Sequence, residues 1–202
     1  MPFNVSTFAA QGLPFGGARP SLFEVFMTLP AAIAEFGAET QFRFVCKAST
    51  IPASTLGQVE VPFFGRKVKF AGNRTFDNWS VTVMNDEDFL VRNAFEKWSS
   101  FINSHENNLR NPGVNSEIGL GSYRTTATVR HFAKTSVLGG GGNVGDSAIP
   151  TREYTFVNIF PISVSTIDLN WETTDSIEEF TVEFAYDYWT VDNDINNKVI
   201  IT

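Results

Sequence analysis

Residues 51–98 read IPASTLGQVEVPFFGRKVKFAGNRTFDNWSVTVMNDEDFLVRNAFEKW and decide the fold of this chain. The segments 59–64 and 67–70 flank Gly65-Arg66, which predicts two strands joined by a hairpin turn. In residues 79–83 large apolar side chains alternate with polar ones, the period of a strand with one wet face. Nothing in this stretch resembles a catalytic centre.

An amphipathic helix is predicted at the end of the same stretch. Asn85 is the candidate N-cap, and the acidic residues 86–88 follow it, where negative charge meets the positive end of the helix dipole. Apolar residues then recur at helical spacing, at Val91, Phe95, Trp98 and Ile102. Because the opposite face is polar, we expect this helix to lie on the outside of a larger body.

Further strands are expected on both sides. They cover residues 22–29, 41–47, 124–134, 154–160 and 181–189, each with apolar residues alternating along much of its length. Residues 49–57 predict an exposed loop, and residues 173–179 predict one helical turn. We therefore predict a mainly β fold, an antiparallel β-sandwich or distorted barrel with one docked α-helix.

Composition limits the possible functions. The chain has 202 residues, one cysteine and a net charge of −7. Proteins that grip nucleic acid do so with clustered Lys and Arg, so this class is not favoured, although an acidic wall could still let DNA slide past. No apolar run approaches the ~18 residues of a membrane span, and no basic segment precedes an apolar one at the N-terminus. We expect neither membrane insertion nor secretion.

Catalytic, metal and cofactor sites are not predicted. The carboxylates 86–88 are explained by the start of the helix. The glycines of residues 140–145 match a nucleotide-binding pattern, but Pro150 stands where the required helix would begin. His105 and His131 have no second His or Cys at ligand spacing. We expect a protein that is not an enzyme and carries no cofactor.

Charge is unevenly distributed along the chain. Residues 43–74 contain six basic residues and one acidic residue, whereas residues 154–197 contain no Lys or Arg and nine acidic residues. Such polarity suits head-to-tail contact between identical subunits. The alternative is that the two charged segments are solvated faces of one monomer, and charge alone favours this alternative.

Two long strings resemble a known family. They are GRKVKFAGNRTFDNWSVTVMNDEDFLVRNAFEKW, in residues 65–98, and YTFVNIFPISVSTIDLNWETTDSIEEFTVEFAYDYW, in residues 154–189. Both resemble the tail tube protein of contractile-tailed (myovirus-type) bacteriophages. The resemblance implies hexameric rings that stack into the hollow tube inside a contractile sheath, through which DNA is ejected. It also implies a fold similar to the tube protein of type VI secretion systems.

The resemblance implies partners. It also favours head-to-tail contact between subunits as the explanation of the uneven charge, in place of two solvated faces. The partners are further copies of the chain, the tail sheath protein, the baseplate and tail-terminator proteins, and the tape-measure protein and genomic DNA in the lumen. The location is the virion tail, with assembly in the host cytoplasm. Candidate contacts between subunits or rings are Ile51, Pro52, Leu56, Arg66, Lys67, Lys69, Arg74, Glu178 and Glu179.

The expected organisation is an irregular arm over residues 1–20, a single domain over residues 21–191 and a tail over residues 192–202. Two alternatives stay open. The chain could be the tube subunit of a type VI-like or extracellular contractile injection system, or a related baseplate or tail-completion protein.

Overall fold

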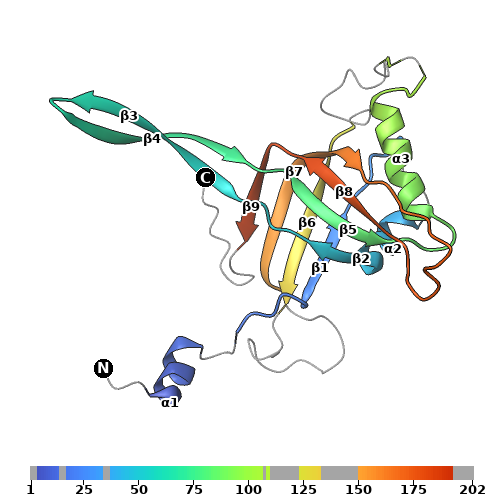
Figure 1. Cartoon of the computed structure of the whole chain (residues 1–202), viewed down its shortest axis with the longest axis horizontal. Helices are drawn as coiled ribbons and strands as arrows, with labels where there is room; N and C mark the ends of the chain where they lie inside the picture. Colours follow the sequence, from blue (N-terminus) through green and yellow to red (C-terminus); the bar gives the residue numbers. More distant parts are fainter. Residues whose placement is uncertain are drawn as a thin grey trace.

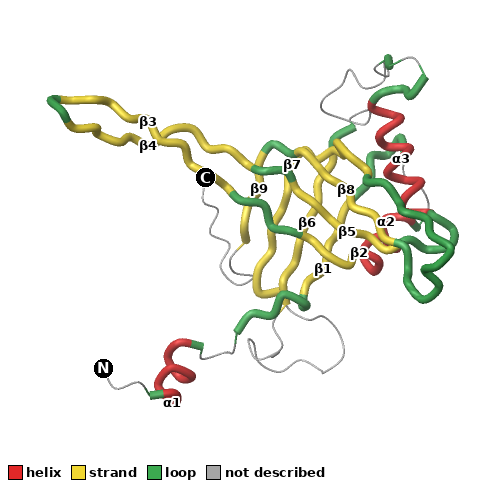
Figure 2. The backbone as a smooth tube through the Cα atoms, in the orientation of Figure 1, coloured by secondary structure: helices red, strands yellow, loops and turns green. Residues whose placement is uncertain are grey.

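The computed structural model describes residues 4–13, 17–33, 37–106, 108–109, 123–132 and 150–192. It confirms a mainly β, antiparallel fold, with two helices packed beside the strands (Figures 1 and 2). The strands are β1 (Phe23–Met27), β2 (Cys46–Ser49), β3 (Ser54–Phe63), β4 (Arg66–Phe76), β5 (Trp79–Met84), β6 (Thr125–Phe132), β7 (Pro150–Val164), β8 (Glu179–Ala185) and β9 (Tyr188–Asp192). The helical segments are α1 (Val5–Thr7), η1 (Phe8–Gly12), α2 (Ala38–Val45) and α3 (Leu90–Ile102).

Strand β7 belongs to both parts of a seven-stranded sheet, here treated as two sheets: β1-β6-β7-β9 and β7-β8-β5-β2. The strand order is β1-β6-β7-β8-β5-β2, and β9 also pairs with β7. One edge of β7 is taken by β6; the other is divided between β9, along residues 153–157, and β8, along residues 160–164. At the point of change Asn158 has φ +59° and its Nδ2 donates to Asp187 Oδ2 at 2.6 Å. The predicted strand 181–189 is therefore two strands, separated at this corner.

Aromatic side chains fill the space between the two sheets and α3. Trp79 of β5 stacks on Phe156 of β7 with ring centroids 4.6 Å apart. Phe184 of β8 touches the rings of Trp79, Phe95 and Trp98 and is fully buried. The indole of Trp98 also donates from Nε1 to the carbonyl of Tyr123 at 2.8 Å. Each buried ring removes a large apolar area from water, so this cluster is the main stabilising element of the body.

The segment predicted as strand 41–47 is mostly helix. Helix α2 runs to Val45, and β2 begins at Cys46. Phe42 is 3% exposed and meets Phe95 edge to face at 5.7 Å, while Phe44 is 73% exposed. Residues two apart lie on nearly opposite sides of a helix, whereas they share one face of a strand. Two helices therefore pack on the body, not one.

The helix predicted after residue 85 is confirmed, but its start is not. Val91, Phe95 and Trp98 are buried, as their spacing predicts. The helix begins at Leu90, whose backbone N–H donates to Asp88 Oδ1 at 3.0 Å. Asn85, the predicted cap, instead donates from Nδ2 to Glu178 Oε1 at 3.1 Å.

Three other expectations can be compared with the structure. Residues 173–178 are irregular apart from one bend at Asp175, and Glu179 begins β8, so the predicted helical turn is wrong. Within the arm of residues 1–20, α1 and η1 stand apart from the body with every side chain exposed (Figure 1). The predicted tail over 192–202 lies outside the described residues except for Asp192. Among the described residues, no helix combines the length and apolar character of a membrane-spanning helix.

Candidate assembly surface

Strands β3 and β4 form a long hairpin that extends away from the body (Figure 1). The pairing runs from Ser54↔Phe76 to Phe63↔Arg66, and neither strand pairs with any other described strand. The tip is Phe64-Gly65, and both residues have positive φ. The predicted hairpin is confirmed, and its strands are longer than expected. The predicted loop 49–57 is correspondingly shorter, because β3 already begins at Ser54.

Two glycines let the strands pass close to each other within the hairpin. The register shifts between Leu56 and Gln58, where one residue of β3 lies opposite two residues of β4. A Cβ added at Gly72 would lie 3.0 Å from the carbonyl carbon of Gly57, and a Cβ at Gly57 would lie 3.1 Å from the carbonyl oxygen of Asn73. At such distances the neighbouring backbone would have to give way by a few tenths of an ångström, so glycine is favoured at this bulge.

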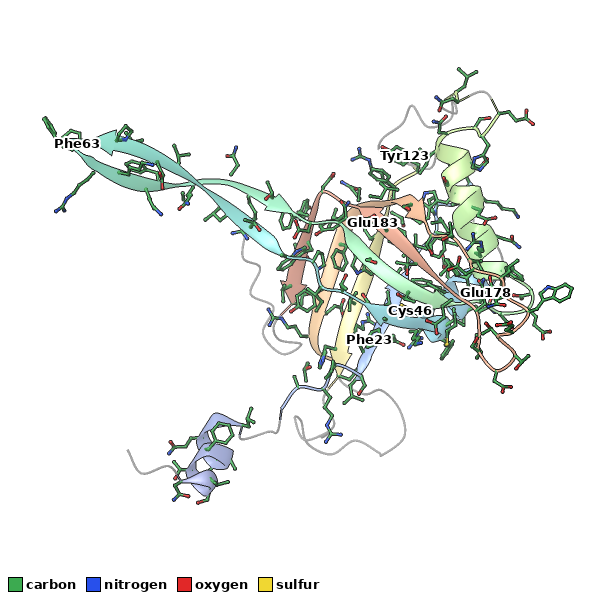
Figure 3. The ribbon with its side chains drawn as sticks, in the orientation of Figure 1. Phe23, Cys46, Phe63, Tyr123, Glu178 and Glu183 are labelled. Atoms are coloured by element: carbon green, nitrogen blue, oxygen red, sulfur yellow. The ribbon has the colours of Figure 1, made fainter. Side chains whose placement is uncertain are left out.

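One face of the hairpin beyond the bulge is apolar and exposed. The register places Val59 opposite Phe70 and Val61 opposite Val68, and Phe63 lies further along the same face. These five side chains, here called the apolar face, are 44% to 64% exposed. An isolated two-stranded hairpin is marginally stable in water, and a contiguous exposed apolar patch usually marks a binding surface. Figure 3 shows Phe63 at the outer end, far from the body.

The opposite face of the hairpin is polar and partly self-neutralised. Glu60 lies between Lys67 and Lys69, with carboxylate oxygens 2.9 Å and 3.6 Å from their ammonium groups. The lysine side chains are well exposed, so these pairs contribute little to stability. Beyond the bulge the hairpin is thus amphipathic: Glu60, Lys67 and Lys69 lie on one face and the apolar groups on the other, where Arg66, opposite Phe63 at the tip, is the one charged residue.

The root of the hairpin is held by aromatic contacts with the body. The ring of Phe76 lies 6.0 Å from that of Tyr186 and 6.1 Å from that of Trp189. Tyr186 donates its hydroxyl to the carbonyl of Asp77 at 2.6 Å. Burial, with the charge of Asp77, raises the pKa of Tyr186 to about 12. The hairpin therefore leaves the body from a fixed base.

The candidate contact residues fall into two groups, one on and just before the hairpin and the other on the side of the body away from the hairpin tip. Most of the basic group is on the hairpin, where Leu56, Arg66, Lys67, Lys69 and Arg74 are all exposed; Ile51, just before it, is also exposed. Pro52 is buried within the subunit, which argues against its predicted contact. Glu179 accepts from Lys47 Nζ at 2.5 Å beside Glu178, which is at the end of the body farthest from Phe63 (Figure 3).

Sequence reasoning missed another exposed apolar group, in the connection between β7 and β8. Trp171 is 100% exposed there, and Leu169 and Ile177 are also largely in water. The available signal was large apolar residues inside an acidic run with no strand or helix period.

Reactive groups do not gather in the described part of the chain. Among those residues, no three His, Cys, Asp or Glu side chains are placed to hold a metal ion. Burial raises the pKa of the Cys46 thiol to about 12, which leaves it protonated and unreactive at neutral pH. A groove of about 320 Å³ lies between α3 and the end of β7, lined by residues that include Arg92, Glu96, Ser99 and Ile162.

The amphipathic hairpin on an antiparallel body can be compared with known proteins. A family model described as phage tail tube protein matches residues 18–192. This chain belongs to the phage tail tube protein family. The resemblance read from residues 65–98 and 154–189 is confirmed at this level.

Relatives of this tail tube protein cover most of its length. Tail tube protein gp19 of Enterobacteria phage T4 is 34% identical over 172 residues, which is 85% of this chain and 90% of gp19. The tail tube protein of Serratia phage KSP90 is 23% identical over 174 residues, 85% of this chain and 86% of that protein.

Two solved structures share the fold of the tail tube chain. The tube-terminating cap of the anti-feeding prophage has a TM-score of 0.57 and 13% identity, covering 88% of this chain and 92% of the cap. The sheath-tube complex of the extracellular contractile injection system PVC has a TM-score of 0.50 and 13% identity, covering 95% of this chain and 99% of the matched chain.

Proposed function

We propose that this chain is the subunit of the inner tail tube of a contractile phage tail, in which rings of six copies stack into a conduit for DNA ejection. The observation that carries the proposal is the hairpin β3–β4, whose apolar face has no covering within the described part of its own chain. A second chain that covered this face would remove five apolar side chains from water.

The hairpin supplies the contact between rings. It extends beyond the body (Figure 1), so it would reach a neighbour along the tube. Residues 54–76 hold four basic residues and one acidic residue, a net charge of +3 in a chain of net charge −7. This charge would draw the hairpin toward an acidic surface on the next ring.

The sheet β1-β6-β7-β9 supplies the wall of the ring. In the described part of the chain, β1 pairs only with β6 and β9 only with β7, so each has one edge without a strand partner. Strand pairing between neighbours at such edges would extend the sheet around the ring. Leaving edges unpaired in a lone subunit would instead invite aggregation.

The polar face of this sheet lines the lumen in this proposal. The register places Glu24 opposite Arg130, Arg130 opposite Glu153, and Glu153 opposite Asp192, so the four side chains form a row across the strands. Arg130 Nε donates to Glu153 Oε2 at 2.8 Å. Arg43 also pairs with Glu24, so three carboxylates and two guanidiniums leave a net charge of −1 here, which would repel DNA phosphates weakly and let the polymer slide.

The partners follow from the place of the tube in the tail. They are the tail sheath around it, the baseplate and tail-terminator proteins at its ends, and the tape-measure protein and genomic DNA inside. We propose assembly in the host cytoplasm and final location in the virion tail. Residues 21–191 act as one domain, with residues 1–20 and 192–202 as extensions that contact neighbours.

A second candidate is favoured by the fold comparison. The cap of the anti-feeding prophage and the PVC sheath-tube complex have the same fold. The chain could therefore serve as the tube of an extracellular or type VI-like injection system, or as a related baseplate or tail-completion protein. Neighbouring genes for a portal and a large sheath protein favour the phage tail, whereas neighbouring effector genes favour an injection system.

Electron microscopy tests the proposal directly. The purified chain is imaged in negative stain over a range of concentrations, with its mass in solution measured alongside. Rings and hollow tubes are expected, and their symmetry gives the number of subunits. A monomer at every concentration that also fails to grow tubes on an added baseplate would overturn the tube proposal.

A further inference from the structure

The connection between β7 and β8, residues 165–178, is here called the acidic loop. It also presents exposed apolar side chains. Leu169, Trp171 and Ile177 point into water, while Ile167 is partly buried against the core. The loop is held at its base because Thr181 N donates to Ser165 Oγ at 2.8 Å.

A turn at the outer end of the acidic loop is also hydrogen-bonded. Asn170 Oδ1 accepts from the backbone N–H of Glu172 at 3.0 Å, and the Asn170 carbonyl accepts from Thr173 N at 3.2 Å. Trp171 is therefore displayed on an organised turn. A fully exposed Trp is unusual, because burying its ring provides more apolar area than almost any other side chain.

The charge of the acidic loop is opposite to that of the hairpin. The loop contains four acidic residues, Asp168, Glu172, Asp175 and Glu178, and no basic residue, a net charge of −4. The hairpin, residues 54–76, carries +3. Each of the two surfaces thus combines exposed apolar side chains with a charge of one sign, and the signs are complementary.

The two surfaces lie at opposite ends of the subunit. Figure 3 places Phe63 at the outer end of the hairpin and Glu178 of the acidic loop on the side of the body away from the hairpin. A contact between them therefore requires two copies of the chain. Copies in the same orientation along the line that joins the two surfaces bring the hairpin of one toward the acidic loop of the next, a heterologous contact that repeats without closing.

We propose that the acidic loop of one subunit is the acceptor for the hairpin of a second copy in the adjacent ring, with Trp171 packed on the apolar face. The carboxylates of the loop face the basic side chains of the hairpin tip, which are Arg66, opposite Phe63 on that face, and Lys67, next to it on the polar face. Tryptophan is over-represented among residues that dominate interface energies, and the charges set the orientation of approach. The proposal rests on the stacking of rings under the proposed function.

The first test replaces the apolar groups of the acidic loop. Leu169→Glu combined with Trp171→Glu should leave rings intact but raise the critical concentration for tube growth at least about tenfold. Leu109→Glu is the matched control, because Leu109 is another largely exposed leucine outside both surfaces. Light scattering and negative stain measure tube growth, and circular dichroism checks the fold. Equal tube growth by wild type and the double variant would overturn the proposal.

The second test exchanges charge between the two surfaces. Arg66→Glu with Lys67→Glu, or Asp168→Lys with Glu172→Lys, should each weaken stacking by juxtaposing like charges. A chain that carries all four substitutions should recover stacking, since the attraction is restored with its sign reversed. Recovery depends on direct contact between these residues, so its absence in a folded, ring-forming protein would refute the assignment of the acceptor.

The outcomes separate this proposal from the one on which it rests. Failure of the wild-type chain to stack, even on a baseplate, contradicts the tube function itself. Wild-type tubes together with normal tubes of the Leu169/Trp171 variant contradict the acceptor alone. If such normal tubes then fail to bind purified sheath protein, the acidic loop is a sheath contact and the inter-ring assignment is wrong.

Discussion

Strand β5 in the body and strand β3 in the hairpin have similar sequence patterns and opposite surroundings. In β5, Trp79, Val81 and Val83 alternate with polar residues and are completely buried. In β3, Val59, Val61 and Phe63 alternate in the same way and all are exposed. Alternation shows which side chains share a face, but a second layer must exist for that face to be buried. The body contains its second layer, whereas the hairpin has none within the described part of the chain; we propose that another chain supplies it.

Breaking the body should have the largest effect on folding. Phe184→Ala removes a fully buried ring that touches Trp79, Phe95 and Trp98, and should lower the free energy of unfolding by about 3–5 kcal/mol. Urea denaturation of the unassembled chain measures the loss. The comparison variant is Phe63→Ala on the hairpin, expected to change stability by no more than about 0.5 kcal/mol. Equal losses in the two variants would mean that the hairpin packs on its own body.

Breaking the apolar face should instead affect assembly. Val61→Ser with Phe70→Ser should leave the free energy of unfolding nearly unchanged and raise the critical concentration for tube growth at least about tenfold. Sedimentation of tubes across a concentration series measures this. Gln58→Ser, on the polar face of the same strands, is the control and should assemble normally. Normal assembly by the Val61/Phe70 variant would exclude the apolar face from stacking.

Reversing charge at the hairpin tip sharpens the comparison with a smaller effect. Arg66→Glu with Lys67→Glu should weaken stacking by about three- to tenfold at low salt, with little change in folding, because these exposed charges act mainly between chains. The deficit should shrink as salt rises, since exposed charges are then screened. Tube growth measured at two ionic strengths tests both statements. Unchanged growth at low salt would reject a role for this basic segment.

The smallest effect is expected where the two regions meet. Burial, with the charge of Asp77, raises the pKa of Tyr186 to about 12, above the usual value of about 10. The unfolded chain therefore loses this proton at lower pH than the folded chain does. The stabilisation is complete below pH ~10 and is lost as pH rises through about 12.

Tyr186→Phe tests that pH dependence. At neutral pH the variant should be less stable than wild type by about 1 kcal/mol, because the hydrogen bond to the Asp77 carbonyl is absent. Above pH ~10 the difference in melting temperature should narrow, since wild type then loses the same contribution. A difference that stays constant from pH 8 to pH 12 would contradict this role of the hydroxyl.

Much of the fold could be predicted from local patterns. The buried faces of β1 and α3 and the hairpin turn at Gly65 follow from spacing and turn chemistry. Residues 41–47 could not be predicted in this way, because their seven-residue alternation places Phe42 and Phe44 on one side of a strand. The structure buries Phe42 against Phe95, a residue far along the chain, and leaves Phe44 outside. Tertiary packing overrode the local period.

The candidate site was predicted in part. Charge runs pointed to Arg66 and Lys67 and to Glu178 and Glu179, but spacing along the chain could not show that these groups lie at opposite ends. Residues near Gly57 were expected to form a loop because small polar residues favour turns. Their pairing depends on the close approach of Gly57 to Gly72, a contact that a single strand does not reveal. Trp171 lies in a segment without the apolar period of a strand or helix, so no pattern predicted where its side chain would lie.

The placement of the hairpin and the acidic loop at opposite ends has a consequence for any stack built through them. Such a stack has direction: its first ring would present one unsatisfied surface to solvent, and its last ring would present the other. The two termini would then require different binding proteins, one offering a receptor for free hairpins and the other offering a projection for free loops. A factor that starts growth at one terminus could not, by the same surface, arrest growth at the other.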